Sequence, residues 1–214
     1  MFKDRVDAGR RLAAELLRLK AETPLVYGLP RGGVPVAAEV ARALGVPLHV
    51  LLVRKIGAPG EPELALGAVA DGDPPLVVWN EALVRELGLD ERRKAELAQE
   101  ELAVLEQRRR RFASLPPRPS AKGRTAIVID DGLATGATAR AALLVLRAER
   151  PARLVLAAPV SSPEAAEELA DDADEVVCLE APALFRGVGA SYRDFGQTSE
   201  DQVIALVRSL GRRG

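Results

Sequence analysis

The sequence predicts an α/β fold with a doubly wound, mainly parallel sheet, and three observations lead to that prediction. Short apolar runs alternate with amphipathic segments along most of the chain. The runs are continuous rather than alternating in polarity, which is typical of parallel strands buried on both faces. The chain has 214 residues, 48% of them hydrophobic, which is enough to form a core. We therefore expect a single domain over residues 1–214, with helices on both faces of the sheet.

The first part of the chain alternates between helix-like and strand-like segments. An amphipathic stripe near the N-terminus indicates a helix, and Gly32 and Gly33 follow the first apolar run as a loop. Gly45 ends the next helical segment, and a loop rich in Gly and Pro occupies residues 57–62. In order, we expect a helix over 4–21, a strand over 25–29, a helix over 34–44, and strands over 48–53, 64–70 and 76–79.

A long, highly charged segment interrupts this alternation. Helical periodicity with a break near Gly88 predicts two helices between residues 80 and 112, within a helical insertion over residues 80–115. The prolines of residues 116–119 form a linker that ends the insertion. The alternation then resumes, with strands expected over 125–129, 154–160 and 175–179 and helices over 138–149, 163–170 and 199–210.

The composition excludes several classes of function. The single Cys178 and single His49 rule out an internal disulfide and any Cys-rich or His-rich metal site, and both lie in apolar runs typical of packed side chains. A net charge of −1 and 3% aromatic residues argue against a nucleic-acid surface. The longest apolar run is far shorter than the roughly 20 residues of a membrane-spanning helix, and no apolar signal region opens the chain. We therefore expect a cytoplasmic protein with neither nucleic-acid nor membrane partners.

The basic residues are mostly Arg, and there are 15 prolines. Few thermolabile side chains and many ion-pairing ones are typical of thermophilic proteins, although a GC-rich genome produces a similar bias.

Residues 126–138 are the segment most informative about function. A buried strand ends in two adjacent carboxylates, Asp130 and Asp131, and a loop of small residues then leads into a helix at about Thr138. The N–H groups at a helix start, together with the positive end of its dipole, bind phosphate. Since carboxylates repel phosphate, the ligand must also offer hydroxyl groups or carry a divalent cation. The loop that would bind the phosphate consists of Ala134, Thr135, Gly136, Ala137 and Thr138.

This segment resembles the motif with which type I phosphoribosyltransferases bind phosphoribosyl diphosphate (PRPP): an apolar strand, two acidic residues, then Ala-Thr-Gly-x-Thr. The resemblance implies the doubly wound fold of that family and transfer of a phosphoribosyl group from PRPP to a nitrogenous base, with release of pyrophosphate and Mg²⁺ as cofactor. It also implies that Asp130 and Asp131, the catalytic candidates, hold the ribose hydroxyls, and that residues 134–138 bind the 5′-phosphate.

Two further segments are similar to parts of that family. The sequence Leu-Pro-Arg-Gly-Gly at residues 29–33 resembles its pyrophosphate loop, and a basic pair at the end of the 48–53 strand resembles the pair that leads into its flexible loop. An ordinary Gly-Gly turn and two solvated cations are the alternative interpretation. By the resemblance, the pyrophosphate would contact Arg31, Gly32, Gly33, Arg54 and Lys55.

Residues 180–200 resemble the family's hood, the variable segment that holds the accepting base. Phe185 and Tyr192 are the candidates for stacking on that base, unless they anchor the loop to the core. Asp194 is a weak candidate for a protein ligand to Mg²⁺. Two positions depart from the family pattern: Gly132 replaces an aliphatic residue, and Ala134 replaces the aspartate of enzymes acting on 6-oxopurines.

Two other functions stay open. The chain would act as a PRPP- or nucleotide-sensing regulator if it kept the binding loop without using it for transfer. It would act as a Mg²⁺-dependent hydrolase of phosphorylated sugars if the acid pair served a different reaction. Residues 108–111 are expected to be a solvated, ion-paired helix end, or the partner surface of a regulator. The resemblance is also compatible with a homodimer. The accepting base is not identified by the sequence.

Overall fold

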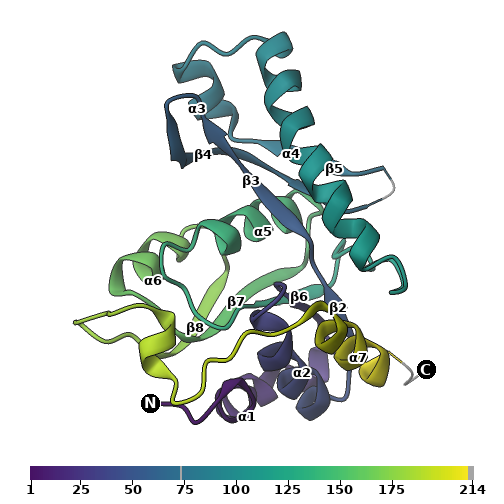
Figure 1. Ribbon diagram of the computed structural model, residues 1–214, viewed down its shortest axis with the longest axis vertical. Helices are drawn as coiled ribbons and strands as arrows, with labels where there is room; N and C mark the ends of the chain where they lie inside the picture. Colours follow the sequence, from purple (N-terminus) through teal and green to yellow (C-terminus); the bar gives the residue numbers. More distant parts are fainter. Residues whose placement is uncertain (73, 212–214) are drawn as a thin grey trace.

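A five-stranded parallel sheet forms the centre of the molecule, in the strand order β2-β1-β6-β7-β8 (Figure 1). The computed structural model describes residues 1–72 and 74–211. Residues 73 and 212–214 of the expected domain over 1–214 lie outside the described residues. Each strand pairs with its neighbours in parallel. The strands are β1 (Leu25–Gly28), β2 (Leu48–Val50), β6 (Thr125–Ile129), β7 (Arg153–Val160) and β8 (Glu175–Glu180).

Helices cover both faces of this sheet, because successive strand residues point to opposite sides. Val26 and Ile127 pack into a core with helices α1, α2 and α7, while Tyr27 and Val128 pack into a second core with α5 and α6. The prediction of a doubly wound α/β fold is therefore confirmed. The helices are α1 (Arg5–Leu16), α2 (Gly33–Leu44), α5 (Ala137–Ala148), α6 (Pro163–Leu169) and α7 (Glu200–Leu210), with short 3-10 helices η1 (Leu17–Glu22) and η2 (Val188–Ser191).

A second, antiparallel sheet was not predicted. It consists of β3 (Val53–Ala58), β4 (Glu61–Ala70) and β5 (Leu76–Trp79), and it stands above α5 in Figure 1. Of the loop predicted over residues 57–62, only Pro59 and Gly60 lie outside the strands, and they form a tight hairpin turn with Gly60 at a φ of +85°. At Gly57 the paired strands come so close that a Cβ atom would lie 2.6 Å from the carbonyl oxygen of Pro62.

The hairpin corrects the expected position of the basic pair. Arg54 and Lys55 do not follow a strand of the parallel sheet: β2 ends at Val50, and both residues lie inside β3. The apolar run over 48–53 hid this boundary, since Leu51 and Leu52 are buried although they belong to neither strand.

The helical insertion forms as predicted, with α3 (Glu81–Glu86) and α4 (Glu91–Arg111). Asn80 and Asp90 cap the two helices, and Gly88 separates them at a φ of +62°. Helix α4 packs against β3 and β4, so the insertion and the antiparallel sheet form one lobe (Figure 1). Among the described residues, no helix combines the length and apolar character needed to cross a membrane.

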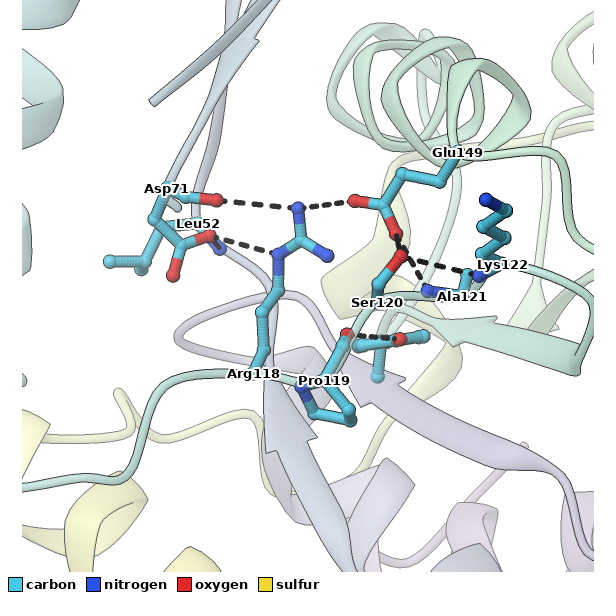
Figure 2. A network of polar contacts seen from close by, with 9 residues as sticks. Leu52, Asp71, Arg118, Pro119, Ser120, Ala121, Lys122 and Glu149 are labelled. Atoms are coloured by element: carbon cyan, nitrogen blue, oxygen red, sulfur yellow. Dashed lines mark hydrogen bonds and ion pairs between the residues drawn. The ribbon is translucent and has the colours of Figure 1, made fainter. Parts of the chain in front are cut away.

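A buried arginine joins the linker after α4 to the rest of the molecule (Figure 2). The Arg118 side chain is 7% exposed and lies between two carboxylates: Nη2 is 2.7 Å from Oε1 of Glu149, and Nε is 3.4 Å from Oδ1 of Asp71. The other carboxylate oxygen of Glu149 accepts hydrogen bonds from Ser120 Oγ and from the Ala121 N–H. Side chains from three separate parts of the chain thus hold the linker in place.

His49 lies on β2, next to a cavity of about 710 Å³ that Arg118 also lines. Burial lowers its pKa to about 4, and the positive charges of Arg118 and Arg124 act in the same direction. Between about pH 6.5 and 4 the unfolded chain therefore binds a proton that the folded chain does not, so stability falls as the pH falls.

We expect the free energy of unfolding of the wild-type chain to drop, relative to that of the His49→Gln variant, by about 2–3 kcal/mol from pH 7 to 4. Urea unfolding at a series of pH values measures this difference. Because His49 is the only histidine, the variant is a clean reference. Parallel pH profiles for the two proteins would contradict the prediction.

Candidate active site

The strand order brings the two predicted phosphate-binding segments together. The chain passes from β1 outward to β2 and returns to the other side of β1 with β6, so the order reverses between β1 and β6. Ligands of doubly wound proteins bind at this kind of reversal, outside the carboxyl ends of the strands. The Leu29 N–H donates to the carbonyl oxygen of Ile129 at 2.9 Å, which joins the loops after the two strands.

Glycine is required where these loops touch. A Cβ atom on Gly32 would lie 1.9 Å from Oδ2 of Asp131, and one on Gly33 would lie 2.6 Å from the carbonyl oxygen of Ile129. Larger residues would push the loops apart. The peptide bond before Arg31 is cis. The predicted pyrophosphate loop and the predicted acid pair therefore belong to one site.

The surroundings of the acid pair disfavour a negative charge on Asp130. Burial raises the pKa of Asp130 well above its usual value, and the neighbouring Asp131 carboxylate adds to that rise. The N–H of Asp131 donates to Oδ1 of Asp130 at 2.9 Å, which fixes the orientation of the buried carboxyl group. Hydroxyl donors or a divalent cation beside the pair would favour its ionised form.

Arg5 binds the second acid of the pair, and the sequence did not indicate this. Its Nε lies 2.7 Å from Oδ2 of Asp131, its Nη1 donates to the carbonyl oxygen of Gly196 at 2.6 Å, and its guanidinium stacks 3.9 Å from the ring centre of Phe195. The Arg5 side chain is only 12% exposed. Sequence periodicity placed Arg5 on an amphipathic helix, and no local signal pairs it with a residue 126 positions away.

Tyr192 supports the acid pair and is not free to stack on a base. Its hydroxyl donates to the carbonyl oxygen of Asp131 at 2.6 Å, and its ring, 6% exposed, packs against Phe2 and Phe195. The expectation of base stacking on Tyr192 is therefore wrong for this conformation, because neighbouring rings already cover it. Phe185 packs at the edge of the same cluster and is partly exposed. Its role as a base contact stays a prediction.

Packing of the hood segment explains why residue 132 is glycine and not the aliphatic residue of the family pattern. A Cβ atom there would lie 2.4 Å from Cγ1 of Val188, on η2, so the hood packs directly onto the chain after the acid pair. The N-terminal segment completes this packing: the Phe2 N–H donates to the carbonyl oxygen of Ser191 at 2.8 Å. A residue larger than glycine would separate the hood from the acid pair.

The predicted phosphate loop surrounds a cavity of about 160 Å³ lined by Asp130 and residues 132–139. Gly136 adopts a φ of +68° immediately before α5, and the first N–H groups of α5 have no acceptor within the helix. Ser162 Oγ donates to the carbonyl oxygen of Ala134 at 2.8 Å and holds the loop from outside. The loop therefore places the start of α5, whose first N–H groups lack acceptors within the helix, against a small concave space, which suits an anion.

The basic residues predicted to contact pyrophosphate lie on two lobes of the molecule. Arg31 is exposed on the loop before α2, whereas Arg54 extends from β3 and pairs with Glu101 of α4. Lys55 is partly buried in the same strand. At the hood, Asp194 Oδ1 accepts a hydrogen bond from the Gly196 N–H at 3.0 Å, beside a cavity of about 620 Å³ that Arg5 also lines. The pyrophosphate and metal roles of these residues stay predictions.

The acid pair, the glycine loop and the N-terminus of α5 thus lie together at the strand reversal of a parallel sheet, where doubly wound proteins place their ligand sites. The family model "Phosphoribosyl transferase domain" matches residues 2–193, which is most of the chain. The chain therefore belongs to the phosphoribosyl transferase family.

Individual relatives agree with this assignment. Two curated proteins of Mycobacterium tuberculosis, "Putative phosphoribosyl transferase MT0597" and "Putative phosphoribosyl transferase Rv0571c", are each 47% identical over 207 residues. That match covers 97% of this chain but 46% of each relative, so the chain spans about half the length of the curated relatives. The crystal structure of TT1426 from Thermus thermophilus is 46% identical, with a TM-score of 0.91, and the match covers 98% of this chain and 99% of that one.

Proposed function

We propose that the chain transfers the phosphoribosyl group of PRPP to a nitrogenous base and releases pyrophosphate in a Mg²⁺-dependent reaction. The observation that carries this proposal is the contact between Gly32 and Asp131, which joins a candidate diphosphate loop to a candidate ribose-binding acid pair beside a phosphate-sized cavity. Such a site matches a ligand that carries a phosphate, ribose hydroxyls and a diphosphate on one sugar.

The charges at the site suit the reaction. Breaking the bond between C1 of the ribose and the diphosphate oxygen builds positive charge on the ribose and negative charge on the leaving group. Asp130 and Asp131 would orient the ribose hydroxyls and favour the cationic ring, while Arg31 and the N–H groups beside it would neutralise the diphosphate. Fixed charges in a site that excludes water can supply much of the rate acceleration.

Magnesium fits the oxygen donors at this site. The ion prefers hard oxygen ligands, and a cation beside Asp130 would favour the ionised form of a carboxyl group whose pKa is raised by burial and by Asp131. In the part of the chain that the structure describes, no three His, Cys, Asp or Glu side chains gather. The ion would be held mainly by oxygens of PRPP, and Asp194 is the candidate for a protein ligand. When bound, the ion supplies positive charge to the departing diphosphate.

A screen for pyrophosphate release tests the proposal. The chain is incubated with PRPP, Mg²⁺ and, in turn, adenine, guanine, hypoxanthine, xanthine, uracil, orotate and nicotinate. Release with one base supports the transferase and names the acceptor. PRPP binding without release for any base would favour a sensing regulator. The ion pair of Arg5 with Asp131 would then occupy a carboxylate that the transfer needs. Phosphate release from simple sugar phosphates without a base would favour a hydrolase.

The phosphate loop provides a narrower prediction. Thr135 Oγ1 lies 3.4 Å from the Ala137 N–H at the start of α5, where it can turn to donate to a phosphate oxygen. We expect Thr135→Ala to weaken PRPP binding by about 1–3 kcal/mol, since one hydrogen bond to a charged group is lost. Isothermal titration with PRPP and Mg²⁺ measures the loss. Thr23→Ala, at the far end of η1, is the control, and an unchanged affinity for Thr135→Ala would contradict the assignment of the loop.

A further inference from the structure

Arg5 connects the hood to the acid pair through three contacts of one side chain. Its Nε lies 2.7 Å from Oδ2 of Asp131, its Nη1 donates to the carbonyl oxygen of Gly196 at 2.6 Å, and its guanidinium carbon lies 3.9 Å from the ring centre of Phe195. The side chains of Arg5 and Asp131 are only 12% and 15% exposed. Water screens a charge pair at this depth less than it screens a pair on the surface, so the contact holds both side chains in place.

The backbone that carries Arg5 is anchored on both sides. After it, the Asp4 side chain caps α1 by accepting a hydrogen bond from the Asp7 N–H at 2.8 Å. Before it, the carbonyl oxygen of Lys3 accepts a hydrogen bond from the Asp194 N–H at 2.9 Å, which attaches the N-terminal segment to the hood. The start of the chain accordingly lies beside the hood in Figure 1. Arg5 therefore keeps a fixed position relative to the hood.

Partners on several sides hold Asp131 in one orientation. The Tyr192 hydroxyl donates to its carbonyl oxygen at 2.6 Å and fixes the backbone. The carboxylate packs directly on the candidate pyrophosphate loop, since a Cβ atom on Gly32 would lie 1.9 Å from Oδ2. An aspartate side chain rotates about two bonds, so the direction of its oxygens depends on partners that bind them. Arg5 supplies such a partner from the side of the hood.

The charge of Arg5 also suits an anionic ligand. Two adjacent carboxylates repel a phosphorylated sugar, and their repulsion is strong where water is excluded. Burial and the charge of Asp131 raise the pKa of Asp130, while the charge of Arg5 lowers it. The guanidinium therefore offsets part of the negative charge of the acid pair.

We infer that Arg5 is a positioning residue for the proposed PRPP site: it holds the Asp131 carboxylate in the orientation that accepts the ribose hydroxyls, and it ties that orientation to the hood. This role rests on the proposed function and makes residues 2–5 part of the site. Arg5 acts through Asp131 and does not itself contact the sugar. Loss of its side chain would leave the carboxylate free to rotate and would restore its repulsion of the ligand.

Isothermal titration with PRPP and Mg²⁺, without any base, tests this role as a double-mutant cycle. We expect Arg5→Ala to weaken PRPP binding by about 10-fold in the wild-type background and by less than about twofold in the Asp131→Asn background, since the carboxylate through which it acts is then absent. Arg5→Lys keeps the charge without the planar fork and should recover part of the loss. Arg10→Ala removes an exposed arginine of the same helix, paired with Glu39, and should change the affinity by less than about twofold.

Chemical rescue provides a readout that a loss of folding would not produce. Arg5 lines the cavity of about 620 Å³ beside the hood, so its truncation opens a space in which a free guanidinium ion can pair with Asp131. Millimolar guanidinium should therefore restore part of the PRPP affinity of Arg5→Ala. It should leave the affinity of the double variant Arg5→Ala, Asp131→Asn unchanged. Sodium chloride at the same ionic strength is the control for salt effects.

The outcomes separate this role from the proposed function. Wild-type PRPP affinity in Arg5→Ala, an equal loss in Arg10→Ala, or the same loss in both backgrounds overturns the role of Arg5 even if the chain transfers phosphoribosyl groups. Tighter binding in Arg5→Ala shows that Arg5 competes with the ribose for the carboxylate, which also overturns it. Loss without rescue, with lowered thermal stability, shows a structural role and overturns it too.

Two further outcomes concern the transferase. A coupled loss that guanidinium rescues, in a chain that releases no pyrophosphate with any base, supports the positioning role of Arg5 and overturns the transferase. A wild-type chain that does not bind PRPP overturns both.

Discussion

We expect Asp131→Asn to lower kcat/KM for PRPP by about 10²–10³-fold, because a neutral amide would replace the carboxylate proposed to orient the ribose and face its developing positive charge. The amide keeps the size of the side chain, so Gly32 still packs against it. It loses most of the attraction to Arg5, which is an ion pair of 2.7 Å in the wild type. Initial rates of pyrophosphate release over a range of PRPP concentrations measure the change.

Glu15→Gln is the control for this experiment. Glu15 is an exposed carboxylate on α1, the same helix that carries Arg5, and its replacement also removes one negative charge. Its kcat/KM should stay within about twofold of wild type. Wild-type activity in Asp131→Asn, or an equal loss in Glu15→Gln, would refute the assignment of the acid pair to PRPP. Thermal unfolding of both variants checks that the fold is retained.

Arg118→Ala lowers the free energy of unfolding by about 3–5 kcal/mol, because it leaves two half-buried carboxylates without their shared cation. Burial by itself raises the pKa of Glu149, but the hydrogen bonds from Arg118 and the Ala121 N–H outweigh burial and lower it. Burial raises the pKa of Asp71 even with Arg118 present. Removing the guanidinium therefore moves the pKa values of both carboxyl groups upward in the folded state. Urea unfolding near neutral pH measures the loss.

The pH dependence of that loss provides a second check. A carboxyl group whose pKa is raised by folding destabilises the folded state above that pKa and binds its proton at lower pH. The difference in the free energy of unfolding between wild type and Arg118→Ala should therefore shrink as the pH falls toward about 4. Arg153→Ala breaks two more exposed ion pairs, with Glu22 and Glu175. It should lower the free energy of unfolding by about 1 kcal/mol or less. Equal losses for the two arginines would contradict a special role of Arg118.

The sequence located those parts of the fold whose signals are local. Apolar runs marked β6 and β7, and Gly45 marked the end of α2. Two adjacent aspartates and the Thr-Gly-x-Thr loop marked the site before the strand order was known. These signals were readable because strand burial, helix capping and phosphate binding each depend on residues close together in the chain.

The hairpin of β3 and β4 was missed for the opposite reason. Whether residues 53–58 continue the second strand or begin another sheet depends on pairing with residues 61–70, and a continuous apolar run up to Val53 favoured the wrong boundary. For Tyr192 the sequence left stacking on a base and anchoring of the loop both open, because the rings that cover it come from Phe2 and Phe195.

By itself the sequence determined the class of fold, and its single Cys and single His excluded an internal disulfide and any Cys-rich or His-rich metal site. Only the tertiary structure decided how charges are distributed around the acid pair. It placed Arg5 on Asp131, 126 positions away in the chain, and it paired Arg54 with Glu101 through the packing of α4 against β3. The physical reason is that electrostatic contacts depend on distance in space, which the order of residues along the chain does not contain.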